Sequence, residues 1–275
     1  MAITNFIPTI WSENLLSSLN HHYIGVANCN RDYEGEIKNR GSSVKICGVG
    51  NITIGDYTKD TDMSTPQDLS DTLAELIIDQ AKYFNFQVDD IDKTQCSPKL
   101  LDAAMRNAAN ALANTADKYV FSLYGQAAQK FDADLSTDSI IDIILKSREL
   151  LYTNNVTDPS DIVIELSPAA ATKLIKEQAD VFSYNNDILS TGCIGSVAGC
   201  KVFVSNNISI EDGPTQIHHC LMRSKRSIAF AEQLSEIEAY RPEKRFADAV
   251  KGLHLYGAKV VYPDEIIDME FTVEE

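Results

Sequence analysis

The sequence lacks the features that mark membrane and secreted proteins. None of its apolar runs approaches the roughly 20 residues that a bilayer-spanning helix needs. At the N-terminus no basic residue precedes an apolar stretch, so no secretory signal is visible. We therefore expect a chain that is made and folded in a cytoplasm and has no membrane partner.

Metal-binding and disulfide patterns are also missing. The six cysteines form no Cys-x-x-Cys pair and are unevenly spaced, so we expect reduced thiols packed as small hydrophobic side chains. His218 and Cys220 would share one face of a strand and could join Cys193 or Cys200 around a metal. Structural zinc sites usually take closely spaced ligand pairs from turns, and these are absent, so we predict no metal site.

Catalytic signatures are equally scarce. The sequence contains no G-x-S-x-G elbow, no H-E-x-x-H helix motif, no dinucleotide fingerprint and no phosphate loop. Five histidines leave an acid/base enzyme little to work with, although carboxylates could substitute for them. We predict no catalytic residue, no cofactor and no enzymatic activity.

Basic residues are outnumbered, which gives a net charge of −16. The field of such a chain repels phosphate backbones and disfavours sequence-independent nucleic-acid binding. The densest basic segment is Arg223-Ser224-Lys225-Arg226. We interpret it as a solvated strand end or turn.

What is present is an ordinary globular composition, 44% hydrophobic and 23% charged, with two unusual segments. The first thirty-odd residues hold the only tryptophan, Trp11, but too few apolar anchors for a core, which predicts a terminal arm that is stabilised only by lying on other copies of the chain. Residues 40–75 alternate briefly between apolar and polar positions around the polar stretch from Asp56 to Asp71. A lone hairpin is marginal in water, so this segment is predicted to project onto a neighbour, with a long surface loop as the alternative.

The middle of the chain predicts a half-buried strand and then a long helix. In the strand, over 76–88, Ile78, Phe84, Phe86 and Val88 share one face by the period of two. Ser97 and Pro98 then open a helix that Gly125 ends. Its apolar stripe is the clearest pattern of the sequence: Leu101, Met105, Ala108, Leu112, Ala116, Tyr119 and Leu123.

Residues 136–240 have a compact α/β pattern. It comprises a helix from Thr137-Asp138, a strand over 162–166, a helix that Ser167-Pro168 opens, a glycine-containing loop (Gly192, Gly195, Gly199), a strand over 201–204 and a strand over 219–230. Further on, Gly257 lies inside a strand pattern, which indicates a bulge or a close backbone approach. His254 is predicted to be a core or interface histidine rather than a catalytic one.

Eight stretches, in order along the chain, then carry a family resemblance. They are Ile7–Ser12, Ala27–Ile37, Gly41–Ile46, Ile54–Tyr57, Ile78–Asp90, Ala116–Tyr119, Val197–Val202 and Phe246–Val260. Together they resemble the tailed-bacteriophage major capsid proteins, in particular the P22-type coat proteins. The resemblance implies an α+β chain with the Hong Kong 97 capsid fold.

That fold implies a division into five segments of one capsid-fold domain. They are an N-terminal arm (1–39), an extended loop (40–78), a peripheral-domain strand with the spine helix (79–135), an axial domain (136–235) and further peripheral-domain strands (236–275). The function implied is self-assembly as pentamers and hexamers into an icosahedral shell of a virion. The shell encloses double-stranded DNA without sequence-specific contact. A portal and a separate scaffolding protein are implied partners, because the chain has no room for an internal scaffolding segment.

The candidate subunit-contact residues lie in the arm, the loop and the last peripheral segment. They are Trp11, Asp56, Tyr57, Lys59, Asp60, Asp62, Arg241, Lys244 and Arg245. Some relatives cross-link through a loop lysine, but nothing in this sequence supports that chemistry for Lys59. Two other functions stay open: an encapsulin-like compartment with protein cargo, and an acidic α/β ligand-binding protein or enzyme that uses the loop from Gly192 to Gly199.

Overall fold

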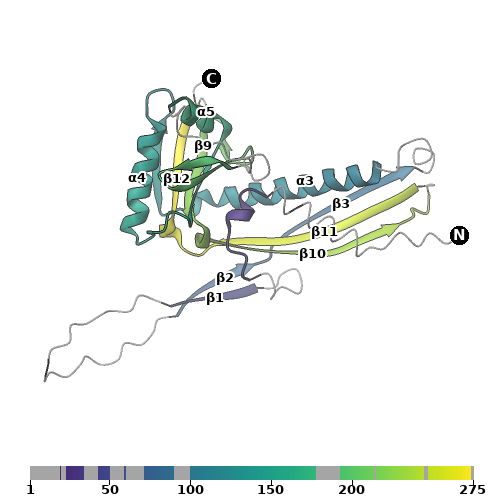
Figure 1. The fold of residues 1–275 in the computed structure, drawn as a ribbon. Coiled ribbons are helices and arrows are strands. Elements are labelled where there is room, and N and C mark those ends of the chain that lie inside the picture. The colour runs from purple at the N-terminus through teal and green to yellow at the C-terminus, as the bar shows by residue number, and fades with distance from the viewer. Residues whose placement is uncertain are drawn as a thin grey trace.

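The computed structural model describes residues 19, 23–33, 43–49, 59, 71–89, 100–177, 193–213, 215–244 and 247–273. In this part the chain combines helices with three sheets: a short hairpin, a long narrow sheet and a compact mixed sheet (Figure 1). No helix among these residues is both long enough and apolar enough to cross a membrane.

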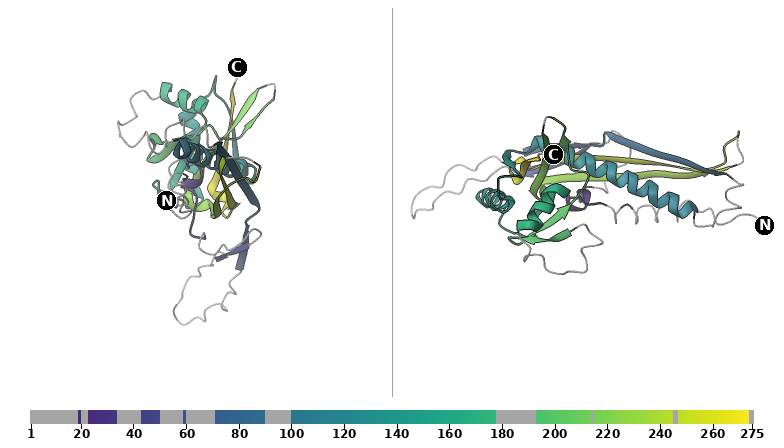
Figure 2. Two further views of the ribbon diagram at one scale, coloured as in Figure 1. Left: turned by 90° about the vertical axis from the view of Figure 1, so that its right-hand side faces the viewer. Right: turned by 90° about the horizontal axis from the view of Figure 1, so that it is seen from above.

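The long sheet is antiparallel, with the strand order β10-β11-β3. Its strands are β3 (Gln80–Asp89), β10 (Ile228–Tyr240) and β11 (Ala247–Val260). Helix α3 (Leu100–Phe121) runs along these strands, as the right-hand view of Figure 2 shows, and passes into the 3-10 helix η3 (Ser122–Gln126). The predicted long helix is therefore confirmed over residues 100–121, while Ser97 and Pro98 lie outside the described residues.

Small side chains let α3 approach its neighbours closely. Its fully buried positions include three alanines, at 109, 113 and 116, with Leu112 beside them. Residues 109, 112, 113 and 116 recur at spacings of three, one and three, so they form one stripe of the helix. The stripe is displaced by about one position from the predicted one, because Met105, Ala108 and Tyr119 are only half-buried.

Strand β3 shows the predicted alternation, but the predicted strand is broken. Phe84, Phe86 and Val88 are half-buried, whereas the intervening side chains are exposed. The break separates β3 from β2 (Asp71–Ile77). There the chain crosses β11 so closely that a Cβ at Gly257 would lie 2.3 Å from the carbonyl oxygen of Ile77. The predicted close approach at this glycine is confirmed.

The compact sheet has the strand order β4-β12-β9-β5-β7-β6, with β8 paired to β9. The strands are β4 (Gln129–Asp134), β5 (Ile162–Leu166), β6 (Cys193–Val197), β7 (Cys200–Val204), β8 (Ile210–Glu211), β9 (Gln216–Ser224) and β12 (Ile266–Val273). Helix α4 (Ile140–Thr153) packs on β4, β9 and β12, and α5 (Pro168–Glu177) packs on β5. The chain passes between the two larger sheets three times: from β3 through α3 and η3 to β4, from β9 through η4 (Lys225–Ser227) to β10, and from β11 through η5 (Pro263–Glu265) to β12.

The local predictions for this half have mixed outcomes. The strand predicted over 219–230 is wrong, because η4 separates β9 from β10, which belong to different sheets. The hydroxyl of Ser167 accepts a hydrogen bond from the Ala170 amide (3.3 Å), which is the predicted helix cap. The predicted glycine loop is wrong over its described part, because β6 and β7 form an antiparallel hairpin there. Ala198 and Gly199 have φ values of 51° and 84°, so they make a two-residue turn with both φ angles positive.

Candidate functional site

The described part of the N-terminal arm, residues 23–33, is fixed to the body of its own subunit by buried charges. Arg223 of β9 is fully buried and donates hydrogen bonds of 2.9 Å to the carbonyl oxygens of Gly25 and Asn28. Its guanidinium also makes a two-pronged pair with the buried carboxylate of Glu165 on β5, again at 2.9 Å. The side-chain amide of Asn28 donates to the same carboxylate (3.3 Å). This ion pair thus joins the arm to two strands of the compact sheet.

Burial opposes the charge on Arg223, but the Glu165 carboxylate and the other groups around the guanidinium together outweigh it, and the pKa of the guanidinium lies above its ordinary value. The guanidinium is therefore charged near neutral pH. A pair of this kind, with two-pronged geometry and its remaining donors used by backbone carbonyls, is the form in which buried charges are tolerated.

A second anchor is Asp117 of α3. Its two carboxylate oxygens accept hydrogen bonds from the backbone amides of Ile24 (3.0 Å) and Val26 (2.9 Å). These amides open the 3-10 helix η1 (Val26–Asn28), so the carboxylate satisfies donors that the short helix leaves free. Burial raises the pKa of Asp117 to about 6, although the two amides act in the opposite direction.

The third anchor is the buried carboxylate of Glu232 on β10. It accepts hydrogen bonds from the hydroxyl of Tyr23 (2.5 Å) and from His254 Nε2 on β11 (2.9 Å), and it pairs with Arg31. Burial alone would raise the pKa of Glu232, but the hydrogen bonds and the Arg31 charge lower it below its ordinary value. His254 is thus a core histidine, as the sequence predicted.

Backbone pairing completes the attachment. The amide of Asn30 donates to the carbonyl of Ile228 (2.9 Å), and its carbonyl accepts from the amide of Phe230 (2.8 Å). Leu19, Tyr23 and Val26 are buried in the main core. The expectation that the arm is stabilised only by other copies is therefore wrong for residues 23–33.

The basic segment at 223–226 also requires a correction. Lys225 and Arg226 lie in η4, and Arg226 is exposed and paired with Glu265, as expected for a solvated turn. Arg223, in contrast, is fully buried, so the interpretation as a solvated turn is wrong for this residue. Nothing in the local sequence separates these arginines, because their partners lie far away in the chain.

The extended loop is described at its base. Strands β1 (Ser43–Val49) and β2 pair antiparallel from Ser43↔Ile77 to Val49↔Asp71, which confirms a hairpin there. The hairpin projects from the body (Figure 1). Its base packs on the long sheet in one small cluster: Val44, Ile46, Leu76, Ile78, Ala229, Ala231 and Leu255. This part, too, is supported by its own subunit.

The long sheet carries exposed apolar surface next to this base. Tyr83 of β3 is 79% exposed and lies opposite Leu253 of β11, which is 37% exposed. A groove of about 300 Å³ separates β3 from α3 and is mainly apolar. Its lining residues are Ala81, Lys82, Tyr83, Phe84, Ala108, Ala111, Leu112 and Thr115. Such a groove between a helix and a sheet is suited to contact with another polypeptide.

The predicted contact residues are only partly described. Lys59 is exposed between β1 and β2, and Arg241 and Lys244 are exposed between β10 and β11. Arg241 pairs with Asp248 (3.3 Å). The structure does not gather these three into one site. The other six, Trp11, Asp56, Tyr57, Asp60, Asp62 and Arg245, lie outside the described residues.

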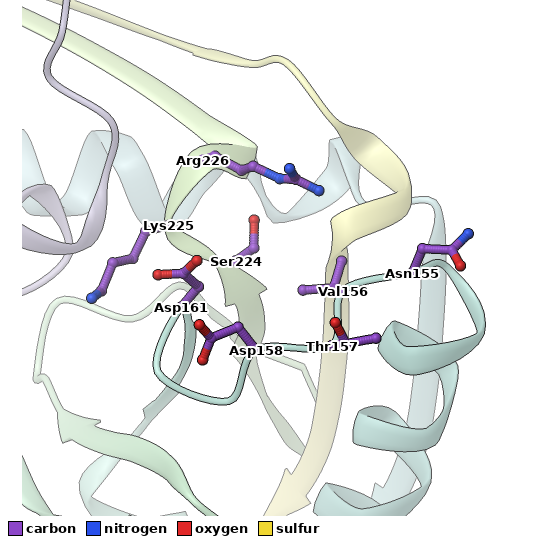
Figure 3. Close-up of a pocket in the computed structure, with 8 residues that line it drawn as sticks. All are labelled: Asn155, Val156, Thr157, Asp158, Asp161, Ser224, Lys225 and Arg226. Carbon is purple, nitrogen blue, oxygen red and sulfur yellow. The ribbon is translucent and has the colours of Figure 1, made fainter. Parts of the chain in front are cut away.

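Figure 3 shows a pocket that is the candidate for a small-molecule site. Its volume of about 280 Å³ is near the lower limit for ligand pockets. It is lined by Asn155, Val156, Thr157, Asp158, Asp161, Ser224, Lys225 and Arg226. The carboxylate of Asp158 accepts hydrogen bonds from the amide and hydroxyl of Ser160, and the guanidinium of Arg226 donates to Glu265. These two charged groups are therefore already paired within the chain. This pocket gives no support to a ligand-binding function.

Comparison with known proteins identifies the fold. No protein-family model matches the sequence, and no curated protein does. Among solved structures, a chain of Mycobacterium phage Che8 is 26% identical, with a TM-score of 0.69 and 98% coverage of both chains. The capsid of Ralstonia phage GP4 gives 13% identity and a TM-score of 0.69, covering 94% of this chain and 91% of that one.

A third similar structure is a virus-like particle from Pyrococcus furiosus. It is 13% identical, with a TM-score of 0.56, and the match covers 94% of this chain and 96% of that one. The comparisons span nearly the whole chain in both directions, so the arm, hairpin, long sheet and compact sheet are matched as one unit. The chain has the fold of the bacteriophage capsid proteins, as its sequence resemblance predicted.

Proposed function

We propose that the chain is a major capsid protein, which assembles as pentamers and hexamers into an icosahedral shell around phage double-stranded DNA. The observation that carries this proposal is the near-complete match, in both directions, to the capsid of Ralstonia phage GP4. Shell subunits need surface that is complementary to identical copies, and the exposed apolar groove between β3 and α3 supplies such surface. The DNA is proposed to be enclosed without sequence-specific contact, and because the net charge of −16 opposes binding to phosphate backbones, closure of the shell rather than affinity for DNA would retain it.

The contact that we propose is made by the extended loop. Residues 56–71 of one subunit lie across the spine helix or peripheral domain of the next, and the groove between β3 and α3 is the surface that receives them. Apolar burial stabilises such a contact by roughly 25 cal/mol per Å², less the free energy of ordering the loop. The free energy of each contact is therefore modest, and a closed shell is stable because it contains many such contacts.

Deletion of residues 58–68 tests this contact. The shortened subunit should fold, because the base of the hairpin is packed on its own body, but it should fail to assemble. Circular dichroism and thermal unfolding would check the fold, and sedimentation with negative-stain microscopy would check assembly. Normal particles from the deletion variant would contradict the loop contact.

A separate scaffolding protein and a portal are further parts of the proposal. They rest on the family resemblance. Expression of this chain alone should give free subunits or irregular aggregates. Regular closed shells from that expression would contradict the need for a scaffold.

The virus-like particle from Pyrococcus furiosus favours a second candidate, a protein compartment of the same fold. The two functions differ in what the shell contains. Purified particles that hold nuclease-protected DNA support the capsid, and particles that hold a protein cargo without DNA support the compartment.

A further inference from the structure

A cluster of ligand-type side chains lies on two adjacent strands of the compact sheet, away from the surfaces described so far. His219 comes from β9, and Asp268 and Glu270 come from β12, with one residue between them. In the β12 to β9 register Glu270 lies opposite His219. Because alternate residues of a strand share a face, both carboxylates point to the side on which the imidazole lies.

The distances suit a single metal ion. His219 Nδ1 lies 3.0 Å from Asp268 Oδ2 and 3.8 Å from Glu270 Oε1, and one ligand atom from each residue lies within 4.8 Å of the others. Nitrogen and oxygen ligands bound tetrahedrally to one zinc ion at about 2.1 Å are about 3.4 Å apart. The observed separations lie on either side of that value, so small side-chain movements would close the site.

The surroundings of the imidazole match those of a metal-binding histidine. On its far side, Nε2 has no hydrogen-bond partner within the described residues, but Glu211 Oε1 of β8 lies 3.5 Å from it, within reach of a small side-chain movement, and this leaves Nδ1 for Asp268 and Glu270. A carboxylate on the second ring nitrogen fixes the orientation of metal-binding histidines. The ring of Tyr124, from η3, stacks on the imidazole with 3.8 Å between centroids, and its hydroxyl donates to the same Glu211 (2.8 Å).

The cluster contains a buried oxygen without a hydrogen-bond partner and more negative than positive charge. Asp268 is fully buried, yet its oxygen Oδ1 has no hydrogen-bond partner within the described residues. Buried carboxylate oxygens are normally paired or bound to a cation. The cluster also brings four carboxylates together, Asp132, Glu211, Asp268 and Glu270, whereas the cation that neutralises them in the described residues is Lys130. Negative charge is therefore in excess.

Lys130 is the competing occupant. Its ammonium lies 2.6 Å from Glu270 Oε1 and 3.7 Å from Asp268 Oδ2, where a metal ion would lie. The lysine side chain is 47% exposed, so it can turn toward solvent and release both carboxylates. A divalent ion would neutralise more of the cluster than the ammonium does, and it would bind the imidazole, which an ammonium cannot.

We propose that His219, Asp268 and Glu270 form a binding site for one divalent transition-metal ion, with a water in the remaining position. The ligand set of one imidazole and two carboxylates belongs to the type that zinc accepts with an open coordination position. The ion would join β9 to β12 beneath Tyr124, where the end of the spine helix meets the compact sheet. This role in stabilising the junction is separate from the contacts between subunits.

Calorimetric titration of ZnCl2 into the full-length chain, after removal of metals with EDTA, tests the proposal. We expect one zinc ion per chain, and a higher midpoint of thermal unfolding with zinc than with EDTA. Glu270→Gln keeps the shape of a partly exposed residue and should weaken zinc binding at least tenfold, as should His219→Gln. His218→Gln is the matched control on the neighbouring position of β9, and it should bind zinc as the parent does.

Lys130→Met separates metal binding from a purely ionic cluster. Removing the ammonium should strengthen zinc binding if the ion and the lysine compete. Absence of saturable binding in both the parent and Lys130→Met would overturn the proposal. So would zinc affinity that stays unchanged in a folded Glu270→Gln chain.

Discussion

Replacing Arg223 by methionine should destabilise the subunit by about 3 to 5 kcal/mol, because removing one member of a buried ion pair leaves the other charged and unpaired. Glu165 would lose both of its 2.9 Å contacts with the guanidinium in a site that is 1% exposed. The carbonyl oxygens of Gly25 and Asn28 would also lose their donors. The damage should therefore extend to the arm, and amide hydrogen exchange over residues 24–30 should become faster.

Urea unfolding of the unassembled subunit at neutral pH measures the stability, and exchange with mass spectrometry measures the arm. Arg226→Met is the matched control, since that arginine is exposed and its pair with Glu265 is worth at most about 1 kcal/mol. The double variant Arg223→Met with Glu165→Met should recover part of the loss, because neither charge remains. A loss below about 1 kcal/mol in Arg223→Met, with unchanged exchange in the arm, would refute the anchoring role of the pair.

Three further predictions concern other elements. Gly257→Ala should lower the midpoint of thermal unfolding and disturb the base of the hairpin, because the new Cβ would lie 2.3 Å from the carbonyl oxygen of Ile77. Gly125→Ala is the control and should leave the midpoint unchanged, since no atom lies within 4 Å of its Cβ position. Equal midpoints for the two variants would contradict the prediction and show that the backbone at Gly257 moves to accommodate the methyl group. Because the pKa of Asp117 rises to about 6 on folding, the folded chain binds this proton more tightly than the unfolded chain. Its stability relative to Asp117→Asn should thus fall by about 2 kcal/mol as pH rises from about 4 to about 6 in urea titrations, and a pH-independent difference would contradict this. Tyr83→Lys should leave the unfolding midpoint unchanged, since the residue is 79% exposed, but should reduce the particle yield in sedimentation; unaltered yield would remove this residue from the contact surface.

Elements whose signals are local could be predicted from the sequence. The alternation of Phe84, Phe86 and Val88, the cap at Ser167 and the glycine at 257 each depend on neighbouring residues or on backbone sterics, and the structure contains all three. The hairpin of β6 and β7 was missed, because three glycines in a short stretch fit a loop as well as a turn between strands. The resemblance to capsid proteins, spread over most of the chain, indicated the whole fold.

The anchors of the arm could not be predicted in this way. Arg223 and Glu165 are 58 residues apart, and Arg223 and Gly25 are 198 residues apart, so no spacing or period links them. The metal ligands were missed for the same reason. From the sequence, His218 and the cysteines were the candidate ligands. The pairing of β9 with β12 instead places His219 beside Asp268 and Glu270, which lie 49 and 51 positions further along the chain.

The three anchors of residues 23–33 come from different parts of the fold, and this has a consequence for assembly. Arg223 belongs to the compact sheet, Asp117 to the long helix and Glu232 to the long sheet. A single short segment thus ties together the three elements whose relative positions set the shape of the subunit. Because each tie is buried and charge-assisted, bending one element against another would expose or unpair a charge. We therefore expect the described body to enter the proposed shell as one rigid unit.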